Sequence, residues 1–172
     1  WDHIFHYLMY GKKNCRSFWS PGTSVDSFIR TVPIDYALLS RRAAAIKEIL
    51  DQAVSVRIVA PGGTDIAMGL KGRLAMLDDG NFQKPADGGN LPAGEAFISP
   101  ENGTAEGIIA FDGSMSLNEG DILIDRPIVC HVRGGFIEKI EGGTEAQALL
   151  ASLKQGQALA REFGESGKLS AE

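Results

Sequence analysis

The hydrophobic period of this chain changes near Val54, and that change limits the folds open to it. Over residues 35–53 the apolar side chains recur every three or four positions, which predicts an amphipathic helix. Over residues 54–60 apolar and polar side chains alternate instead, which predicts a half-buried strand. The turn-forming sequence Pro61-Gly62-Gly63 follows, and residues 65–73 can return as the second strand of a hairpin.

The rest of the chain carries short strand patterns separated by tight turns, after a loop-like stretch at residues 74–90. Further strands are predicted at residues 95–99, 104–111, 122–124, 128–132 and 135–141. Residues 25–31 can form a short helix, and a closing helix is predicted over residues 146–163.

These elements predict the fold class and a division into domains. Helix first and strands afterwards indicate an α+β fold, with a mixed or antiparallel sheet flanked by helices at about residues 35–53 and 146–163. We expect residues 1–53 to be the end of one domain with its connecting helix, and residues 54–172 to belong to a second domain.

The charge balance and the cysteine count exclude several kinds of protein. Seventeen basic residues are outnumbered by twenty-two acidic ones, and they are scattered, so we expect no nucleic-acid partner. No run of roughly 18 apolar residues exists, so we expect no membrane partner. Cys15 and Cys130 are too few for a disulfide framework, which favours a reducing compartment and a cytoplasmic location.

Aromatic residues gather at the start of the chain, which begins at Trp1. Six of the thirteen aromatic residues lie in the first nineteen positions, and such a stretch normally packs against something. We therefore expect the chain to begin inside a longer protein or to be a processed product. Unpaired strand edges and uncovered apolar surface would then favour association with a partner.

Two pairs of residues with reactive side chains lie close together in the sequence. His3 and His6 would share one face of a helix, but two imidazoles without a third ligand do not form a metal site, so packing or surface roles are expected. Cys130 and His131 are neighbours on a predicted strand and should point to opposite faces. They cannot form a catalytic dyad together.

Glu95 is the carboxylate with the most informative surroundings. It follows the constrained turn Pro92-Ala93-Gly94 and opens a short apolar strand. A carboxylate at the start of a buried strand is costly to desolvate unless a cation or strong donors lie beside it, and a divalent metal would supply that cation. A solvent-facing glutamate at a strand end is the alternative, and the local pattern leaves both open.

Several motifs, taken in order, resemble the aminopeptidase T family, the thermophilic-type leucyl metallo-aminopeptidases. The most specific is Asn90-Leu91-Pro92-Ala93-Gly94-Glu95-Ala96-Phe97, with Asn102-Gly103-Thr104-Ala105-Glu106-Gly107 after it. The others are residues 17–22, residues 28–36, and residues 61–66 followed by Gly72-Arg73. The likeness runs from about Arg16 to the end of the chain.

This resemblance implies a two-domain hydrolase with a two-metal centre of zinc, cobalt or manganese, peptide substrates and a homodimeric assembly. By residue match, Glu95 is one metal ligand, while Glu101 and Glu106 are candidates for supporting or surface positions. The remaining ligands of the family lie downstream of the matched region, so the resemblance implies an incomplete metal centre in this chain.

Three functions follow from these expectations. The first is a metal-dependent aminopeptidase, or a truncated piece of one, that releases N-terminal amino acids from peptides. The second is a non-catalytic folding or association module descended from that family. The third is a metal-dependent ring-cleaving dioxygenase, because bacterial dihydroxypyridine dioxygenases look similar in overall fold but ligate iron through other positions.

Overall fold

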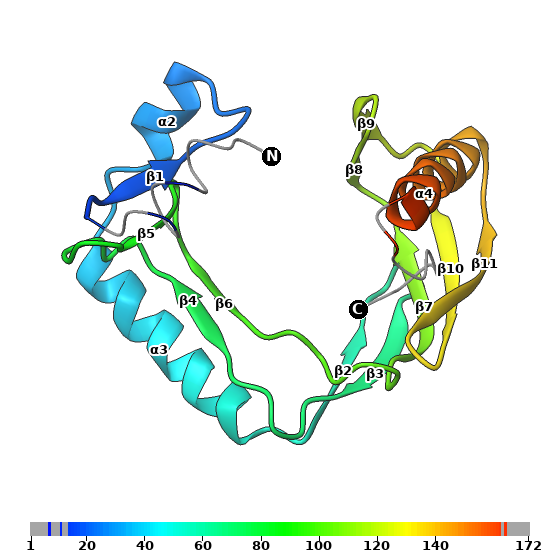
Figure 1. The fold of residues 1–172 in the computed structure, drawn as a ribbon, viewed down its shortest axis with the longest axis horizontal. Coiled ribbons are helices and arrows are strands. Elements are labelled where there is room, and N and C mark those ends of the chain that lie inside the picture. The colour runs from blue at the N-terminus through cyan, green and yellow to red at the C-terminus, as the bar shows by residue number, and fades with distance from the viewer. Residues whose placement is uncertain (1–6, 8–10, 12–13, 163, 165–172) are drawn as a thin grey trace. The chain divides into compact units, whose positions relative to one another are not determined.

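A computed structural model of the chain describes residues 7, 11, 14–162 and 164. The chain divides into two compact units, which are described separately (Figure 1). Unit 1 consists of Trp1–Gln52 and Leu74–Ile98, and unit 2 consists of Ala53–Arg73 and Ser99–Glu172. The assignment of residues 1–53 and 54–172 to two domains of a family stays a prediction.

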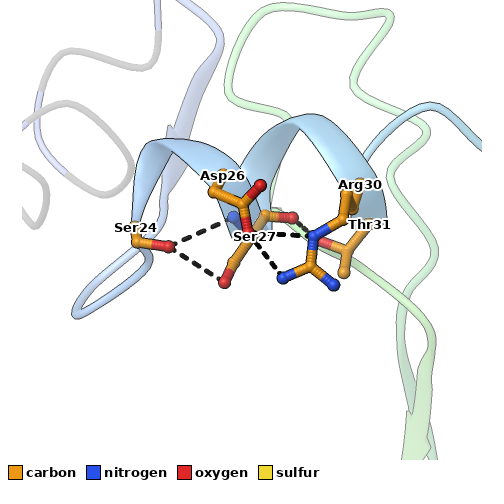
Figure 2. A network of polar contacts seen from close by, with 5 residues as sticks. All are labelled: Ser24, Asp26, Ser27, Arg30 and Thr31. Carbon is orange, nitrogen blue, oxygen red and sulfur yellow. Dashed lines mark hydrogen bonds and ion pairs between the residues drawn. The ribbon is translucent and has the colours of Figure 1, made fainter.

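The first helix of unit 1, α2 (Val25–Thr31), is short and is held by local polar contacts (Figure 2). The Ser24 hydroxyl accepts a hydrogen bond from the Ser27 N–H at 3.1 Å, which satisfies one of the unpaired donors at a helix start. Arg30 pairs with Asp26 one turn earlier, at 2.7 Å. Both side chains are exposed, so this pair contributes little to stability.

The long helix of unit 1, α3 (Tyr36–Gln52), packs against a two-stranded ladder (Figure 1). Asp35 begins the helix by accepting the Leu38 N–H at 2.9 Å. The ladder pairs β4 (Met76–Asp78) antiparallel with β6 (Glu95–Phe97). At the other end of the helix, Asp51 accepts the Ala75 N–H at 2.8 Å and so joins α3 to the start of β4.

A second ladder in unit 1 is parallel. It pairs β1 (Ser17–Trp19) with β5 (Gly88–Asn90). The Ser20 hydroxyl extends this contact beyond the strands by donating to the Leu91 carbonyl at 2.5 Å.

Unit 2 is built on a five-stranded antiparallel sheet with the strand order β11-β10-β7-β3-β2. The strands are β2 (Ser55–Val59), β3 (Asp65–Gly69), β7 (Glu106–Phe111), β10 (Ile128–Arg133) and β11 (Phe136–Glu141). A hairpin of β8 (Ser114–Leu117) and β9 (Gly120–Leu123) lies between β7 and β10 in the sequence.

The closing helix, α4 (Thr144–Glu162), covers one face of this sheet beside β10 and β11 (Figure 1). Strand β10 alternates in burial, with Ile128, Cys130 and Val132 buried and the residues between them less so. Ile128 and Cys130 are fully buried and form a core with Ala146 of α4. The period-2 pattern of β10 and the period-3.6 stripe of α4 therefore meet in one hydrophobic layer.

The predicted α+β class, with helices near both ends of the chain and mostly antiparallel strands, is confirmed. The predicted loop at residues 74–90 is wrong in part, because β4 and β5 form there. Neither strand carries an alternation of apolar and polar side chains that would predict it from the sequence. β4 has only three residues, and β5 is Gly88-Gly89-Asn90, which pairs through its backbone. Phe163, the predicted end of the last helix, lies outside the described residues. Within the described part of the chain, every helix is too short or too polar to cross a membrane.

Candidate functional site

Glu95 lies at the first position of β6, directly opposite Asp78 of β4. The turn before it is held by a hydrogen bond from the Gly94 N–H to the Asp78 carbonyl, at 2.8 Å. The Glu95 side chain is exposed, as the alternative interpretation from the sequence expected. Its carboxylate therefore carries no large desolvation cost that a metal would have to offset.

Asp78 is the buried carboxylate of this ladder, with 9% of its surface exposed. One oxygen, Oδ2, accepts the Asn90 N–H at 2.7 Å. The other oxygen, Oδ1, is enclosed and has no hydrogen-bond partner among the described residues. Burial raises the pKa of Asp78, the Asn90 bond opposes that rise, and the nearby charges of Glu95 and Asp79 add to it.

The sequence reasoning missed Asp78, because Asp78-Asp79-Gly80 matches a turn signal. In the structure Asp78 is the last residue of β4, and only Asp79 and Gly80, the other two residues of the turn signal, lie outside the strand. Its burial depends on β5, whose Gly89 leaves room for the carboxylate. A Cβ atom at Gly89 would lie 2.4 Å from Oδ1 of Asp78. No local pattern in the sequence could reveal this contact.

The two carboxylates of the ladder do not form a complete metal centre. In the part of the chain that the structure describes, no group of three or more His, Cys, Asp or Glu side chains could hold a metal ion. A non-haem or two-metal site needs at least three protein ligands in a suitable geometry. The described residues therefore do not fit a resident metal by themselves.

The other two glutamates proposed from the sequence lie in unit 2 and have structural contacts. Glu106 accepts the Gly134 N–H at 2.7 Å and so holds the turn between β10 and β11. Glu101 donates its backbone N–H to the Gly69 carbonyl at 2.8 Å. These contacts fix loops of unit 2.

Cys130 and His131 point to opposite faces of β10, as expected. Cys130 is fully buried, and burial raises the pKa of its thiol, so it is a core residue rather than a nucleophile. His131 lies on the other face, with Nε2 2.6 Å from Glu141. Lys139 contacts the same carboxylate at 2.7 Å, and these two neighbours, Lys139 first, lower the pKa of Glu141. His3 and His6 lie outside the described residues.

Comparisons with known proteins point to one enzyme family. A family model described as NicX, 2,5-dihydroxypyridine 5,6-dioxygenase, matches residues 23–159. A curated 2,5-dihydroxypyridine 5,6-dioxygenase of Pseudomonas putida is 30% identical over 120 residues, which are 66% of this chain and 33% of that protein. This chain thus spans about a third of the length of the curated relative that it matches.

Two solved structures share the fold. The structure of 2,5-dihydroxypyridine dioxygenase from Pseudomonas putida superposes with a TM-score of 0.69 at 26% identity, covering 81% of this chain and 39% of that one. Wild-type AmpT from Thermus thermophilus superposes with a TM-score of 0.54 at 22% identity, covering 72% of this chain and 31% of that one. At that identity the second likeness shows the fold alone.

The expectation of an aminopeptidase T family member is therefore wrong, and the dioxygenase alternative is the better one. The same family match contradicts the expected metallo-aminopeptidase activity, the expected classification as a hydrolase and protease, and the expected peptide substrates. The expected homodimer rested on the same resemblance and is not shown. The physical reason is that the motifs quoted for the resemblance shape turns and close contacts of a shared fold, and a shared fold does not carry a shared reaction.

Proposed function

Because the chain belongs to the family described as NicX, 2,5-dihydroxypyridine 5,6-dioxygenase, we propose that it forms part of an enzyme that opens a dihydroxylated pyridine ring with molecular oxygen. The observation that carries this proposal is the family match over residues 23–159, which includes parts of both units. The likeness in fold to the Pseudomonas putida dioxygenase supports it, at a TM-score of 0.69.

We propose a divalent metal for this reaction, and iron rather than the zinc, cobalt or manganese centre expected from the sequence. Zinc does not change its oxidation state, whereas non-haem oxygenases commonly hold iron(II) between two histidines and one carboxylate. The described residues do not supply such a set. Glu95 is the candidate for one carboxylate ligand, and no step of the reaction is assigned to a metal held by the described residues alone.

The position of Glu95 supports a role in binding. Its side chain is exposed at the start of β6, so its oxygens are open to a metal ion or to a hydroxyl group of the ring. Asp78, directly across the ladder, is buried and tied to Asn90, so it is the less accessible of the two carboxylates. We therefore expect Glu95 to interact with ligands and Asp78 to position the strands around it.

The test is an oxygen-uptake assay of the chain with added iron(II) and 2,5-dihydroxypyridine, followed in parallel by the loss of ring absorbance. A dioxygenase places both oxygen atoms in the product, so one oxygen molecule should disappear for each ring opened. Binding of the ring to the iron-loaded chain is measured separately by calorimetry. The proposal is contradicted if iron produces neither oxygen uptake nor saturable binding of the ring.

A pair of matched variants tests the contribution of Glu95. Glu95→Gln removes the charge at nearly constant shape, and Glu101→Gln makes the same change at an exposed position of unit 2. If Glu95 is a ligand, iron affinity should fall in the first variant by at least the roughly 10–100-fold that loss of a residue supporting a ligand typically costs, and should stay unchanged in the second. Equal affinities in both variants would remove Glu95 from the site while leaving the family function standing.

We also propose a reducing compartment, the cytoplasm, for this protein. Cys15 and Cys130 are both free thiols in the structure, and Cys130 is fully buried within the sheet of unit 2. Free thiols persist most readily where cellular reductants keep them reduced. Localisation of a tagged chain by microscopy or fractionation tests this, and recovery from an oxidising compartment would contradict it.

A further inference from the structure

Two exposed apolar side chains lie on the ladder of unit 1 that carries Glu95. Met76 of β4 and Phe97 of β6 are direct partners in the antiparallel register. Met76 is 51% exposed and Phe97 is 41% exposed, although both side chains are large and apolar. Directly paired residues of an antiparallel ladder have Cβ atoms about 4.5–5.5 Å apart, so these two side chains form one surface, which we call the Met76–Phe97 patch.

The patch lies on the same side of the ladder as Glu95. Helix α3 packs against the other side (Figure 1), where a Cβ atom at Gly94 would lie 3.4 Å from Cδ1 of Leu39. Successive residues of a strand point to opposite faces, so Glu95 and Phe97 point away from the helix and Ala96 points towards it. Ala96 is accordingly less exposed than either of these neighbours.

An open carboxylate therefore lies at one end of an apolar surface. Glu95 and Phe97 are two residues apart on β6, a distance of about 6.5 Å along a strand. Asp78, across the ladder from Glu95, is buried and bonded to Asn90, so Glu95 is the more open of the two carboxylates. Small-molecule sites typically combine apolar and aromatic side chains with a few polar groups that fix the orientation of the ligand.

The chemistry of the patch favours the face of an aromatic ring. Phenylalanine prefers offset-stacked or edge-to-face contacts with other rings, and these contribute more than the area that they bury. The methionine thioether also makes favourable contacts with aromatic rings, and its flexible side chain adapts to their position. A saturated ring of the same size would gain from burial of area alone.

We propose that Met76 and Phe97 hold the ring of the substrate, with Glu95 at the polar edge of that ring. This inference rests on the proposed function, which supplies the ring. It adds two binding residues that carry no charge and take no part in holding a metal.

The first test uses the methionine methyl groups of the whole chain, isotope-labelled for nuclear magnetic resonance. 2,5-Dihydroxypyridine is titrated without iron and without oxygen, so that no ring is opened. We expect a saturable shift of the Met76 methyl signal, which is assigned by its loss in Met76→Leu, because a nearby ring current changes the local field. The methyl signals of Met68 and Met115, both in unit 2, should stay in place. Absence of a saturable Met76 shift, or equal shifts of all three signals, would overturn the proposal.

A pair of ligands tests the contribution of the aromatic face. Cyclohexane-1,4-diol is a ring of the same size that also carries two hydroxyl groups, but it is saturated. We expect it to bind about 3–10-fold more weakly than 2,5-dihydroxypyridine, because it cannot make aromatic contacts with Phe97. Equal affinities of the two compounds would contradict the role given to the patch.

Matched phenylalanine variants locate the ring. Phe97→Leu keeps an apolar side chain but removes the aromatic ring, and should weaken 2,5-dihydroxypyridine binding about 3–10-fold. Phe97→Tyr keeps the ring and should bind as the parent does. Phe136→Leu makes the first change at a phenylalanine of unit 2 that is 39% exposed, and should leave binding unchanged. Equal affinities in Phe97→Leu and Phe136→Leu would overturn the assignment, and would be expected if the patch packs against another polypeptide instead.

The outcomes separate this inference from the proposed function. Ring opening by the iron-loaded parent chain, together with an unchanged ring affinity in Phe97→Leu, would refute the role of the patch alone. A saturable Met76 shift without oxygen uptake in the presence of iron would support the patch and count against the ring-opening reaction.

Discussion

Substitution of Gly107 should test the order of strands in unit 2 most directly. Gly107 lies in β7 between β3 and β10, opposite Ile66 on one side and Val132 on the other. A Cβ atom there would be 2.2 Å from the Asp65 carbonyl oxygen and 2.9 Å from the Ile66 Cα atom. Both are backbone atoms, so they cannot move away by a change of rotamer. The φ of Gly107, +132°, is also one that L side chains rarely adopt.

The expected cost of Gly107→Ala follows from these two effects. A non-glycine residue held in such a backbone conformation costs about 1–3 kcal/mol. Overpacking of a closed contact costs about another 1–3 kcal/mol. The total of about 2–6 kcal/mol is a large part of the 5–15 kcal/mol that typically stabilises a domain. We therefore expect Gly107→Ala to unfold at a much lower urea concentration than the parent chain.

The matched control is Gly113→Ala, because a Cβ atom at Gly113 would have nothing within 4 Å. Its free energy of unfolding should stay within about 0.5 kcal/mol of the parent value. Unfolding is followed by circular dichroism in urea for all three proteins. If Gly107→Ala were as stable as Gly113→Ala, the close approach of β7 to β3, and the strand pairing that causes it, would be wrong.

Three further predictions concern polar groups. The pKa of Asp78 is raised above its ordinary value of 3.8, so the contribution of this residue to stability is full below that value and is lost as the pH rises through the folded-state pKa. Asp78→Asn should therefore gain in stability over the parent as the pH rises from 4 towards neutrality. A stability difference that does not change with pH in urea titrations would contradict this. Thr64 Oγ1 accepts the Ala110 N–H at 2.9 Å and donates to the Ala110 carbonyl at 3.2 Å. Thr64→Val removes both bonds and should cost about 1–3 kcal/mol in urea unfolding, whereas Thr64→Ser keeps the hydroxyl and should lose less. Equal losses in the two variants would exclude these bonds as the cause. Tyr36→Phe should be neutral or stabilising in a thermal melt, since the hydroxyl is enclosed and has no hydrogen-bond partner among the described residues. A loss above about 1 kcal/mol would contradict this prediction.

The segment that suggested the wrong family shows what such motifs report. In Asn102-Gly103-Thr104-Ala105-Glu106-Gly107, Thr104 accepts the Gly69 N–H, Glu106 holds the turn before β11, and Gly107 permits a close backbone approach. These residues serve the packing of unit 2. Two families with the same fold can share such residues while their reactions differ, so the motif order indicated the fold correctly and the chemistry wrongly.

The elements that could be predicted from the sequence are those with a local cause. The helix of residues 36–52 and the strand of residues 128–133 repeat their apolar side chains at the spacing of the structure they form. The short strands β1, β4, β5 and β8 were not predicted, because three or four residues carry too little periodicity. The pairings of β1 with β5 and of β4 with β6 join segments that are distant in the sequence, whereas β8 pairs with β9, the next strand along the chain.

The sequence by itself therefore determined the α+β class, the main helices, the hairpin of β2 and β3, and the opposite orientation of Cys130 and His131. Each of these follows from side-chain alternation, helical spacing or turn chemistry within about twenty residues. Only the tertiary structure decided that Asp78 is buried while Glu95 opposite it is exposed, and that Tyr36 and the loop of residues 80–83 line one pocket. Burial and cavities arise from contacts between segments far apart in the chain, and no local pattern encodes those contacts.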